Sequence, residues 1–192
     1  MRKNYGEFIE KLEPDCVFTF GSNHDPKTGV GGFHGAGSAG FASFGRAGNV
    51  WREEGYDQKP NGWKGKWNVK GIGEGLQEGS EGKSYALPTV TGPGQKRSLS
   101  EDQIMENIQR MYECARSHPE LEFLVAYSAV GNKPNLCGYA HETLAGLFRS
   151  AGEIPRNVTF SGSYTKLIFG EGFVSSACLG DKPFPKLPDI FQ

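Results

Sequence analysis

The chain has 192 residues and a mass of 20.9 kDa, which suits one domain with a sizeable core. Its 21 basic and 22 acidic side chains give a net charge of -1, so no global field holds a polyanion or an anionic membrane. The 36% hydrophobic content excludes a disordered chain, and the 28 glycines indicate many special backbone positions. No apolar run has the length of a membrane helix, and no signal-like segment follows Met1, so we expect a cytoplasmic protein.

Four cysteines are spread widely along the chain and form no C-x-x-C pair; they are Cys16, Cys114, Cys137 and Cys178. Without a nearby histidine at ligand spacing, they predict no structural zinc site. Two disulfides would suit a secreted protein, but in the absence of an export signal we expect small buried side chains. We therefore expect neither a metal nor a cofactor.

The first half of the chain predicts a helix, a strand and a glycine-rich loop. Apolar residues at helical spacing indicate a short amphipathic helix over residues 4–12. Residues 16–20 are β-branched and aromatic, which indicates a buried strand ending at Gly21, and a helix over residues 36–46 is expected after the glycine-rich loop. Residues 49–83 hold all three tryptophans without a clear period, so we expect an exposed hairpin or an irregular insertion.

The second half alternates strands and helices. Residues 84–87 predict a strand ended by Pro88, and the capping box of Ser100 and Gln103 begins a helix that runs to His118. The remaining predicted elements are a central parallel strand over residues 123–127, an amphipathic helix around residues 144–151 closed by Gly152, a strand over residues 158–160 and an irregular tail over residues 170–192. This alternation predicts a single α/β domain over residues 1–192.

Glycine-rich connections that follow strands are the best candidates for a binding site. In open α/β sheets, ligands bind beyond the carboxyl ends of the strands. Here Gly21-Ser22-Asn23 is followed by a second glycine run at residues 29–37 that leads into the expected helix. Exposed main-chain amides and a helix N-terminus are the groups that hold a pyrophosphate. The spacing fits neither a dinucleotide-binding fingerprint nor a P-loop, and a merely tight loop is the alternative.

Four motifs in chain order resemble the macrodomain family, in a divergent phage- or bacterial-type branch. They are Phe20-Gly21-Ser22-Asn23, the loop from Gly31 to Gly37, Tyr85-Ala86-Leu87-Pro88, and Ser128-Ala129-Val130-Gly131. The resemblance covers about residues 16–162. It implies a three-layer α/β/α architecture with a mixed sheet, and a cleft that binds ADP-ribose.

The resemblance also assigns roles to individual residues. Asn23 would contact and orient the distal ribose, and Gly21 and Ser22 lie beside it. The residues that would follow the diphosphate and that ribose are Gly31, Gly32, Phe33, Gly35 and Ala36, and the second phosphate loop would be formed by Ser128, Ala129, Val130 and Gly131. Many hydrolytic macrodomains carry an aspartate after the glycine triplet, where this chain has His34. His34 is either a general base, a ligand donor or a helix cap.

The implied function is binding of ADP-ribose or a related NAD-derived nucleotide diphosphate, with hydrolysis of ADP-ribose linkages as a separate question. An ADP-ribosylated macromolecule is then a possible partner. The alternatives are a non-catalytic module for protein interaction or signal sensing, and a phosphatase acting on ADP-ribose 1″-phosphate. Lysines and tryptophans alternate at residues 59–70 as in single-stranded nucleic-acid platforms, but glutamates follow, so we expect a solvated hairpin or lid and no nucleic-acid partner.

Overall fold

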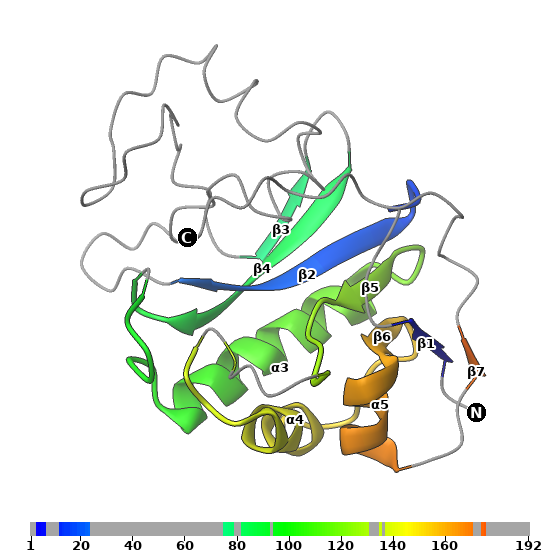
Figure 1. Ribbon diagram of the computed structural model, residues 1–192. Coiled ribbons are helices and arrows are strands. Elements are labelled where there is room, and N and C mark those ends of the chain that lie inside the picture. Colours follow the sequence, from blue (N-terminus) through cyan, green and yellow to red (C-terminus); the bar gives the residue numbers. More distant parts are fainter. Residues whose placement is uncertain are drawn as a thin grey trace, which may run out of the picture.

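The computed structural model describes residues 3–6, 12–23, 75–78, 82–92, 94–130, 135, 137–170 and 174–175. They form one seven-stranded sheet in the order β3-β4-β2-β5-β6-β1-β7 (Figure 1). The strands are β1 (Lys3–Tyr5), β2 (Cys16–Asn23), β3 (Gly75–Glu78), β4 (Lys83–Val90), β5 (Glu122–Val125), β6 (Val158–Ser161) and β7 (Val174–Ser175). The helices of this described part are α3 (Glu101–Ser117), α4 (His141–Ser150) and α5 (Gly162–Phe169).

The sheet is mixed, with a parallel centre and one antiparallel edge pair. Strand β3 pairs antiparallel with β4, and every other pairing is parallel. Strand β2 is an interior strand, where Thr19 is opposite Tyr85 of β4 and Val125 of β5. Its first residues, 16–19, are buried on both faces, as expected for a central parallel strand. The α/β class is therefore confirmed, and strands lie where they were predicted. Their ends differ, because β2 continues past Gly21 to Asn23, whereas β5 stops at Val125, two residues before the predicted end.

Helix α3 begins at the predicted capping box. The Ser100 hydroxyl accepts a hydrogen bond from Gln103 N at 3.2 Å, and Gln103 Oε1 accepts one from Ser100 N at 2.9 Å. Both bonds satisfy amides that the first helical turn leaves without a partner. One face of the helix is buried, and its apolar residues are Ile104, Ile108, Met111, Tyr112 and Ala115. This stripe positions α3 across the sheet.

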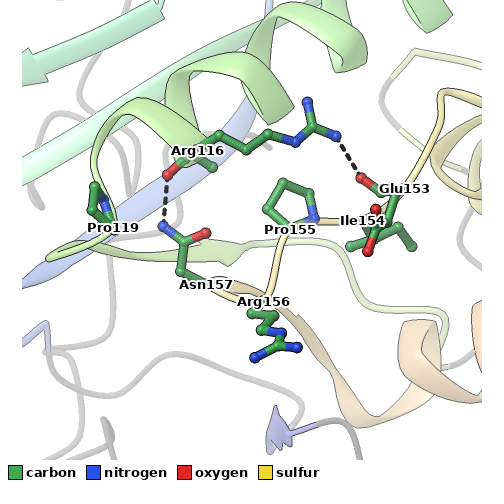
Figure 2. Close-up of a pocket in the computed structure, with 8 residues that line it drawn as sticks. Arg116, Pro119, Glu153, Ile154, Pro155, Arg156 and Asn157 are labelled. Atoms are coloured by element: carbon green, nitrogen blue, oxygen red, sulfur yellow. Dashed lines mark hydrogen bonds between the residues drawn. The ribbon is translucent and has the colours of Figure 1, made fainter.

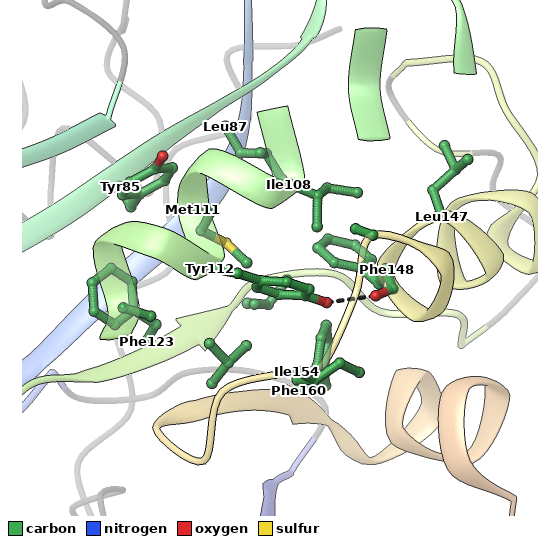
Figure 3. Close-up of a cluster of buried hydrophobic side chains, with 14 of the residues drawn as sticks. Tyr85, Leu87, Ile108, Met111, Tyr112, Phe123, Leu147, Phe148, Ile154 and Phe160 are labelled. Carbon is green, nitrogen blue, oxygen red and sulfur yellow. Dashed lines mark hydrogen bonds between the residues drawn. The ribbon is translucent and has the colours of Figure 1, made fainter. Parts of the chain in front are cut away.

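The largest apolar core lies between the sheet and the three helices (Figure 3). The strands contribute alternate residues to it, such as Leu87 of β4, Phe123 of β5 and Phe160 of β6. The hydroxyl of Tyr112 donates to Phe148 O at 2.6 Å and so joins α3 to α4 inside this core. The packing holds the carboxyl ends of the strands in a fixed arrangement.

The opposite face of the sheet carries smaller apolar clusters. Tyr5, Cys16 and Leu124 are buried together, and Phe18 is buried beside Phe20; Leu12 packs on both groups. The expectation for the cysteines is confirmed at Cys16 and at Cys137, another buried free thiol, whereas Cys114 is half-buried and Cys178 lies outside the described residues.

The helix predicted over residues 4–12 is wrong at its first residues. Lys3–Tyr5 is strand β1, which inserts between β6 and β7. The Tyr5 side chain is buried and its hydroxyl donates to Val125 O, so pairing within the sheet overrides the helical spacing. Residues 7–11 lie outside the described part.

The strand predicted to end at Pro88 continues to Val90. Proline lacks the N–H that a ladder needs, and it is tolerated beside an irregularity or on an unpaired side. Pro88 meets both conditions, because β3 reaches only Ala86 and the register of β2 and β4 shifts just beyond Ser22. The side chain of Asn107 donates to Pro88 O at 2.9 Å and further holds this end of β4.

Two other regions that the sequence leaves undefined contain strands. Residues 75–78 of the predicted insertion form β3, which makes an antiparallel pair with β4, while residues 49–74 lie outside the described part. The predicted irregular tail contains β7 at Val174–Ser175, parallel to β1. The sequence patterns predict no helix where α5 lies. The predicted helix at residues 36–46 lies outside the described residues.

Candidate functional site

The carboxyl ends of the parallel strands β2, β4, β5 and β6 meet at one edge of the sheet (Figure 1). The segments at this edge are residues 21–23, 88–92, 126–130 and 161–163. They carry hydroxyl, amide and main-chain polar groups but no charged side chain. The edge can therefore hold a ligand through dipoles and hydrogen bonds.

The chain reverses direction across the sheet between β2 and β5. After β2, the next strand that the structure describes is β3, which lies beyond β4 on one side of β2. After β5, the next strand is β6, which lies on the other side. Neighbouring parallel strands whose connections diverge in this way form a topological switch point, where open α/β sheets bind ligands.

The loop after β5 is anchored to both neighbouring strands. Ala126 N donates to Thr19 O of β2 at 2.7 Å. The Ser161 hydroxyl at the end of β6 donates to Tyr127 O at 2.6 Å. The loop after β5 is thereby fixed beside the end of β2, and the two segments predicted to bind ligand lie on neighbouring strands.

Two main-chain amides of this loop already have acceptors within the protein. Ala129 N donates to the Ser163 hydroxyl at 2.9 Å, and Val130 N donates to the Ser128 hydroxyl at 3.3 Å. The prediction of bare amides at these positions is therefore wrong in detail. A serine hydroxyl instead accepts from each of these amides.

Gly21 is required by a neighbouring side chain. A Cβ atom at this position would lie 2.6 Å from the Tyr127 hydroxyl oxygen and 3.3 Å from Thr89 Oγ1. The missing side chain thus makes room for the tyrosine, whereas the glycine motif predicts room for a ligand. Nearby, the Thr89 hydroxyl donates to Ser22 O at 3.5 Å and links the ends of β4 and β2.

An aromatic column supports the Tyr127 ring. The ring stacks on Tyr164 at 5.5 Å between centroids and meets Phe148 edge-on at 5.9 Å. The Tyr164 hydroxyl accepts from Asn135 Nδ2 at 2.9 Å and lies 2.7 Å from His141 Nδ1. Because Asn135 supplies a donor, the Tyr164 proton is free to point to His141 Nδ1.

Burial controls the proton affinities in this column. Loss of solvation raises the pKa of the Tyr127 hydroxyl well above its usual value of 10.0, and the nearby Cys137 and Tyr164 add to the rise while the Thr89 hydroxyl opposes it. Burial likewise raises the pKa of Tyr164, with Asn135 opposing, and that of the Cys137 thiol. The described site therefore holds neutral hydroxyls and a neutral thiol at physiological pH.

Of the residues predicted from the sequence, the structure places Gly21, Ser22 and Asn23 at the end of β2. Ser128, Ala129 and Val130 follow the adjacent strand β5. The side chain of Val130 is 59% exposed, whereas Ser22 is buried. The other predicted residues lie outside the described part; they are Gly31, Gly32, Phe33, His34, Gly35, Ala36 and Gly131. The roles assigned to those residues stay predictions.

The sequence patterns do not single out Tyr127, Thr89 or Ser163 as residues of this edge. An aromatic residue at the end of a strand carries no signal for its hydroxyl, since in the sequence Tyr127 is only one member of an apolar run. Ser161 does offer a signal, because it caps α5 by accepting from Tyr164 N at 3.3 Å. A serine directly before a helix start would mark the end of β6, and Ser163 lies two residues after that serine.

The connection between β4 and α3 contains Arg97, whose cationic side chain contacts the segment before α4. Arg97 adopts a left-handed backbone conformation with φ of 54°, which is uncommon for a residue with a Cβ. Its Nε donates to Gly138 O at 2.9 Å, and its guanidinium lies 5.5 Å from the centroid of the Tyr139 ring. Arg97 therefore holds the segment before α4 in place.

Two hollows among the described residues are lined in part by α3. One of about 310 Å³ is formed between the C-terminal end of α3 and the segment before β6 (Figure 2). There Arg116 donates to Glu153 O at 2.7 Å, and Asn157 donates to Ala115 O at 2.8 Å. A smaller one, of about 160 Å³, lies between α3 and β4 beside Tyr85. Neither contains a residue predicted from the sequence to bind ligand, but Pro88, at the carboxyl end of β4, lines the smaller one.

Within the described ranges, no group of three or more histidine, cysteine or acidic side chains is placed to hold a metal ion. None of the helices described above has both the length and the apolar character needed to cross a membrane. Comparisons of the chain with family models, with curated proteins and with solved structures each find no match.

Proposed function

We propose that this chain binds ADP-ribose or a related NAD-derived nucleotide diphosphate where β2 and β5 end. The observation that carries the proposal is the switch point between these strands, with Gly21-Ser22-Asn23 on one side and Ser128-Ala129-Val130 on the other. Ligands of open α/β sheets bind at such points. The two segments are also those on which the resemblance to macrodomains depends.

A macrodomain-like, three-layer form of the α/β fold is part of this proposal. The mixed sheet and the helices α3, α4 and α5 on one face are compatible with it. The four motifs occur in the order that the resemblance implies, and the segments at positions 20–23, 85–88 and 128–130 belong to the neighbouring elements β2, β4 and the loop after β5.

The ligand's diphosphate would be held without charged side chains from the described edge. Phosphate oxygens would replace the Ser128 and Ser163 hydroxyls as acceptors for the amides of Val130 and Ala129. The released hydroxyls would then donate to the same phosphates, so no hydrogen bond is lost in the exchange. Helix α5 starts beside this loop, and its N-terminus favours negative charge.

Calorimetric titration with ADP-ribose, ADP and NAD tests the proposal. A glutamate at the exposed position 130 would face the diphosphate, so Val130→Glu should weaken ADP-ribose binding at least about tenfold through like-charge repulsion. Ser150→Glu is the matched control, because Ser150 is exposed at the far end of α4. It should leave the affinity within about twofold.

The absence of heat and of a thermal shift at millimolar ADP-ribose would overturn the proposal and favour the protein-interaction alternative. Equal weakening by both glutamate variants would also count against this location. If ADP-ribose binds, incubation with ADP-ribosylated substrates beside Asn23→Ala and His34→Ala variants tests hydrolysis. Full turnover by both variants would remove these residues from the reaction.

A further inference from the structure

Two buried hydroxyl groups at the switch point make no hydrogen bond of normal geometry, although the Thr89 hydroxyl lies close enough to that of Tyr127 to oppose the rise in its pKa. Within the described part of the chain, Thr19 Oγ1 and the Tyr127 hydroxyl oxygen are the buried side-chain polar atoms without such a bond. Thr19 lies in β2 opposite Val125, the last residue of the neighbouring strand β5, and Tyr127 follows two residues later in the loop after β5. A buried polar group without a partner loses solvation and gains nothing in return, so each such group calls for an explanation.

Several other buried hydroxyls of the described chain are paired. Tyr5 donates to Val125 O, Tyr112 donates to Phe148 O, and Tyr164 is held by Asn135. The Ser161, Thr159 and Thr165 hydroxyls donate to oxygen acceptors. The fold therefore satisfies its buried hydroxyls in general, and the exceptions gather where the strand connections diverge.

The Tyr127 hydroxyl is held rigidly against the end of β2. Stacking on Tyr164 and the edge-on contact with Phe148 fix the ring. The hydroxyl then lies against Gly21, where a Cβ would be only 2.6 Å away. Because Gly21 itself is exposed, the hydroxyl is separated from the surface of the edge by a residue without a side chain.

We propose that Tyr127 is a ligand-binding residue whose hydroxyl donates a hydrogen bond to an acceptor oxygen of the bound nucleotide diphosphate. This inference rests on the proposed function and adds a direct contact that the sequence motifs do not contain. The ligand oxygen supplies the partner that the protein does not, at the junction of Gly21 and Thr89. Binding thereby removes the cost of the unpaired hydroxyl.

The chemistry suits a donor to an anion. Burial keeps the Tyr127 hydroxyl protonated at physiological pH, since its pKa lies well above the usual value. A neutral O–H can donate to a phosphate or ribose oxygen without adding charge to the site. Removal of the hydroxyl costs affinity, because the ligand oxygen has then been desolvated without a partner.

The test compares two variants that each remove one buried hydroxyl. Tyr127→Phe should weaken ADP-ribose binding at least tenfold in calorimetry, while the midpoint of urea denaturation stays unchanged or rises. Tyr112→Phe is the matched control, because Tyr112 donates to Phe148 O inside the helix core, away from the edge. It should lower the denaturation midpoint and leave the affinity within twofold.

Titration with ADP identifies the accepting oxygen. If Tyr127→Phe loses affinity for ADP and ADP-ribose to a similar extent, the accepting oxygen belongs to the diphosphate. If only the affinity for ADP-ribose falls, the accepting oxygen belongs to the distal ribose. Wild-type protein that binds ADP-ribose while Tyr127→Phe binds it within twofold overturns the inference and leaves the proposed function standing. Wild-type protein that binds neither ligand overturns the proposed function, and this inference with it.

Discussion

Substitution of Gly21 by alanine tests the contact between the ends of β2 and the loop after β5. The new Cβ would lie 2.6 Å from the hydroxyl oxygen of Tyr127 and 3.4 Å from its Cζ. The tyrosine cannot simply turn away, because Tyr164 and Phe148 hold its ring. Removal of the hydroxyl by Tyr127→Phe takes away the closest contact and leaves the ring in place.

The expected magnitudes come from two opposing effects. Insertion of a methyl group into a packed site costs roughly 1–3 kcal/mol. Alanine also restricts the unfolded chain, which returns about 0.4–1 kcal/mol where the backbone permits it, and Gly21 shows no left-handed φ that would prevent this. Gly21→Ala should therefore lower the free energy of unfolding by about 1–2 kcal/mol in the wild-type background.

The same substitution should be nearly neutral when Tyr127 is phenylalanine. Urea denaturation of the wild type, both single variants and the double variant gives the coupling energy between the two positions. We expect a coupling of about 1–2 kcal/mol. Additive effects, within about 0.3–0.5 kcal/mol, would refute the claim that Gly21 makes room for the tyrosine hydroxyl.

Three further predictions concern stability. Thr19→Val should leave the free energy of unfolding unchanged or raise it by up to about 1 kcal/mol, because the buried Thr19 hydroxyl has no hydrogen-bond partner. Thr159→Val should lower the free energy of unfolding by about 1–3 kcal/mol, because the buried Thr159 hydroxyl donates a hydrogen bond to the Glu122 carboxylate. Urea denaturation that gives the reverse order of stability would contradict both expectations. Asn157 donates to three carbonyl oxygens at 2.8, 3.0 and 2.9 Å with only two amide hydrogens, so Asn157→Ala should cost about 2 kcal/mol, and a cost below about 0.5 kcal/mol would exclude this role. Burial raises the pKa of Tyr85 and Tyr164 above 10.0, so their contribution to stability is complete below pH 10 and is lost as the pH rises toward the folded-state values; thermal unfolding across pH 8–11 should show a fall above about pH 10, and a flat profile would contradict it.

The elements that the sequence predicts well are those with strong local signals. The helix α3 has both a capping box at Ser100 and an uninterrupted apolar stripe, so local and tertiary preferences agree. The strand over residues 123–127 is a continuous apolar run, and it forms the central parallel strand β5 with its end at Val125. Patterns of this kind locate the strands, but the strand ends at the candidate site differ from the predicted ones, because β2 and β4 run further and β5 stops earlier.

The failures occur where long-range contacts decide the outcome. Tyr5 shares a helical spacing with the apolar residues up to Leu12, yet residues 3–5 form a strand because β6 and β7 offer hydrogen-bonding partners more than 150 residues away. Pro88 is tolerated within β4 because the pairing between β3 and β4 goes no further than Ala86, and no local rule reveals this. The short helix α5 lacks a long apolar stripe and escapes a search by periodicity.

The candidate site also has features that the sequence predicts and features that depend on long-range contacts. Glycine and serine at residues 21–23 and 128–130 mark the two segments, and the neighbouring positions of β2 and β5 bring these segments together. The sequence does not show that Ser163 accepts from Ala129 N, or that Tyr127 covers Gly21. Both contacts join residues that are distant along the chain, so they emerge only when the sheet has formed.

The hydroxyl of Tyr127 is the strongest sign that this edge serves a purpose besides folding. A phenylalanine at the same position would keep the stack on Tyr164 and the contact with Phe148, and it would relieve the close approach to Gly21. For folding alone, phenylalanine is therefore the better residue. Sites that depart from the best choice for stability are expected where binding or catalysis demands it. An unpaired hydroxyl at a topological switch point fits that expectation, because a ligand at the edge would complete the hydrogen bond that the folded chain leaves unmade.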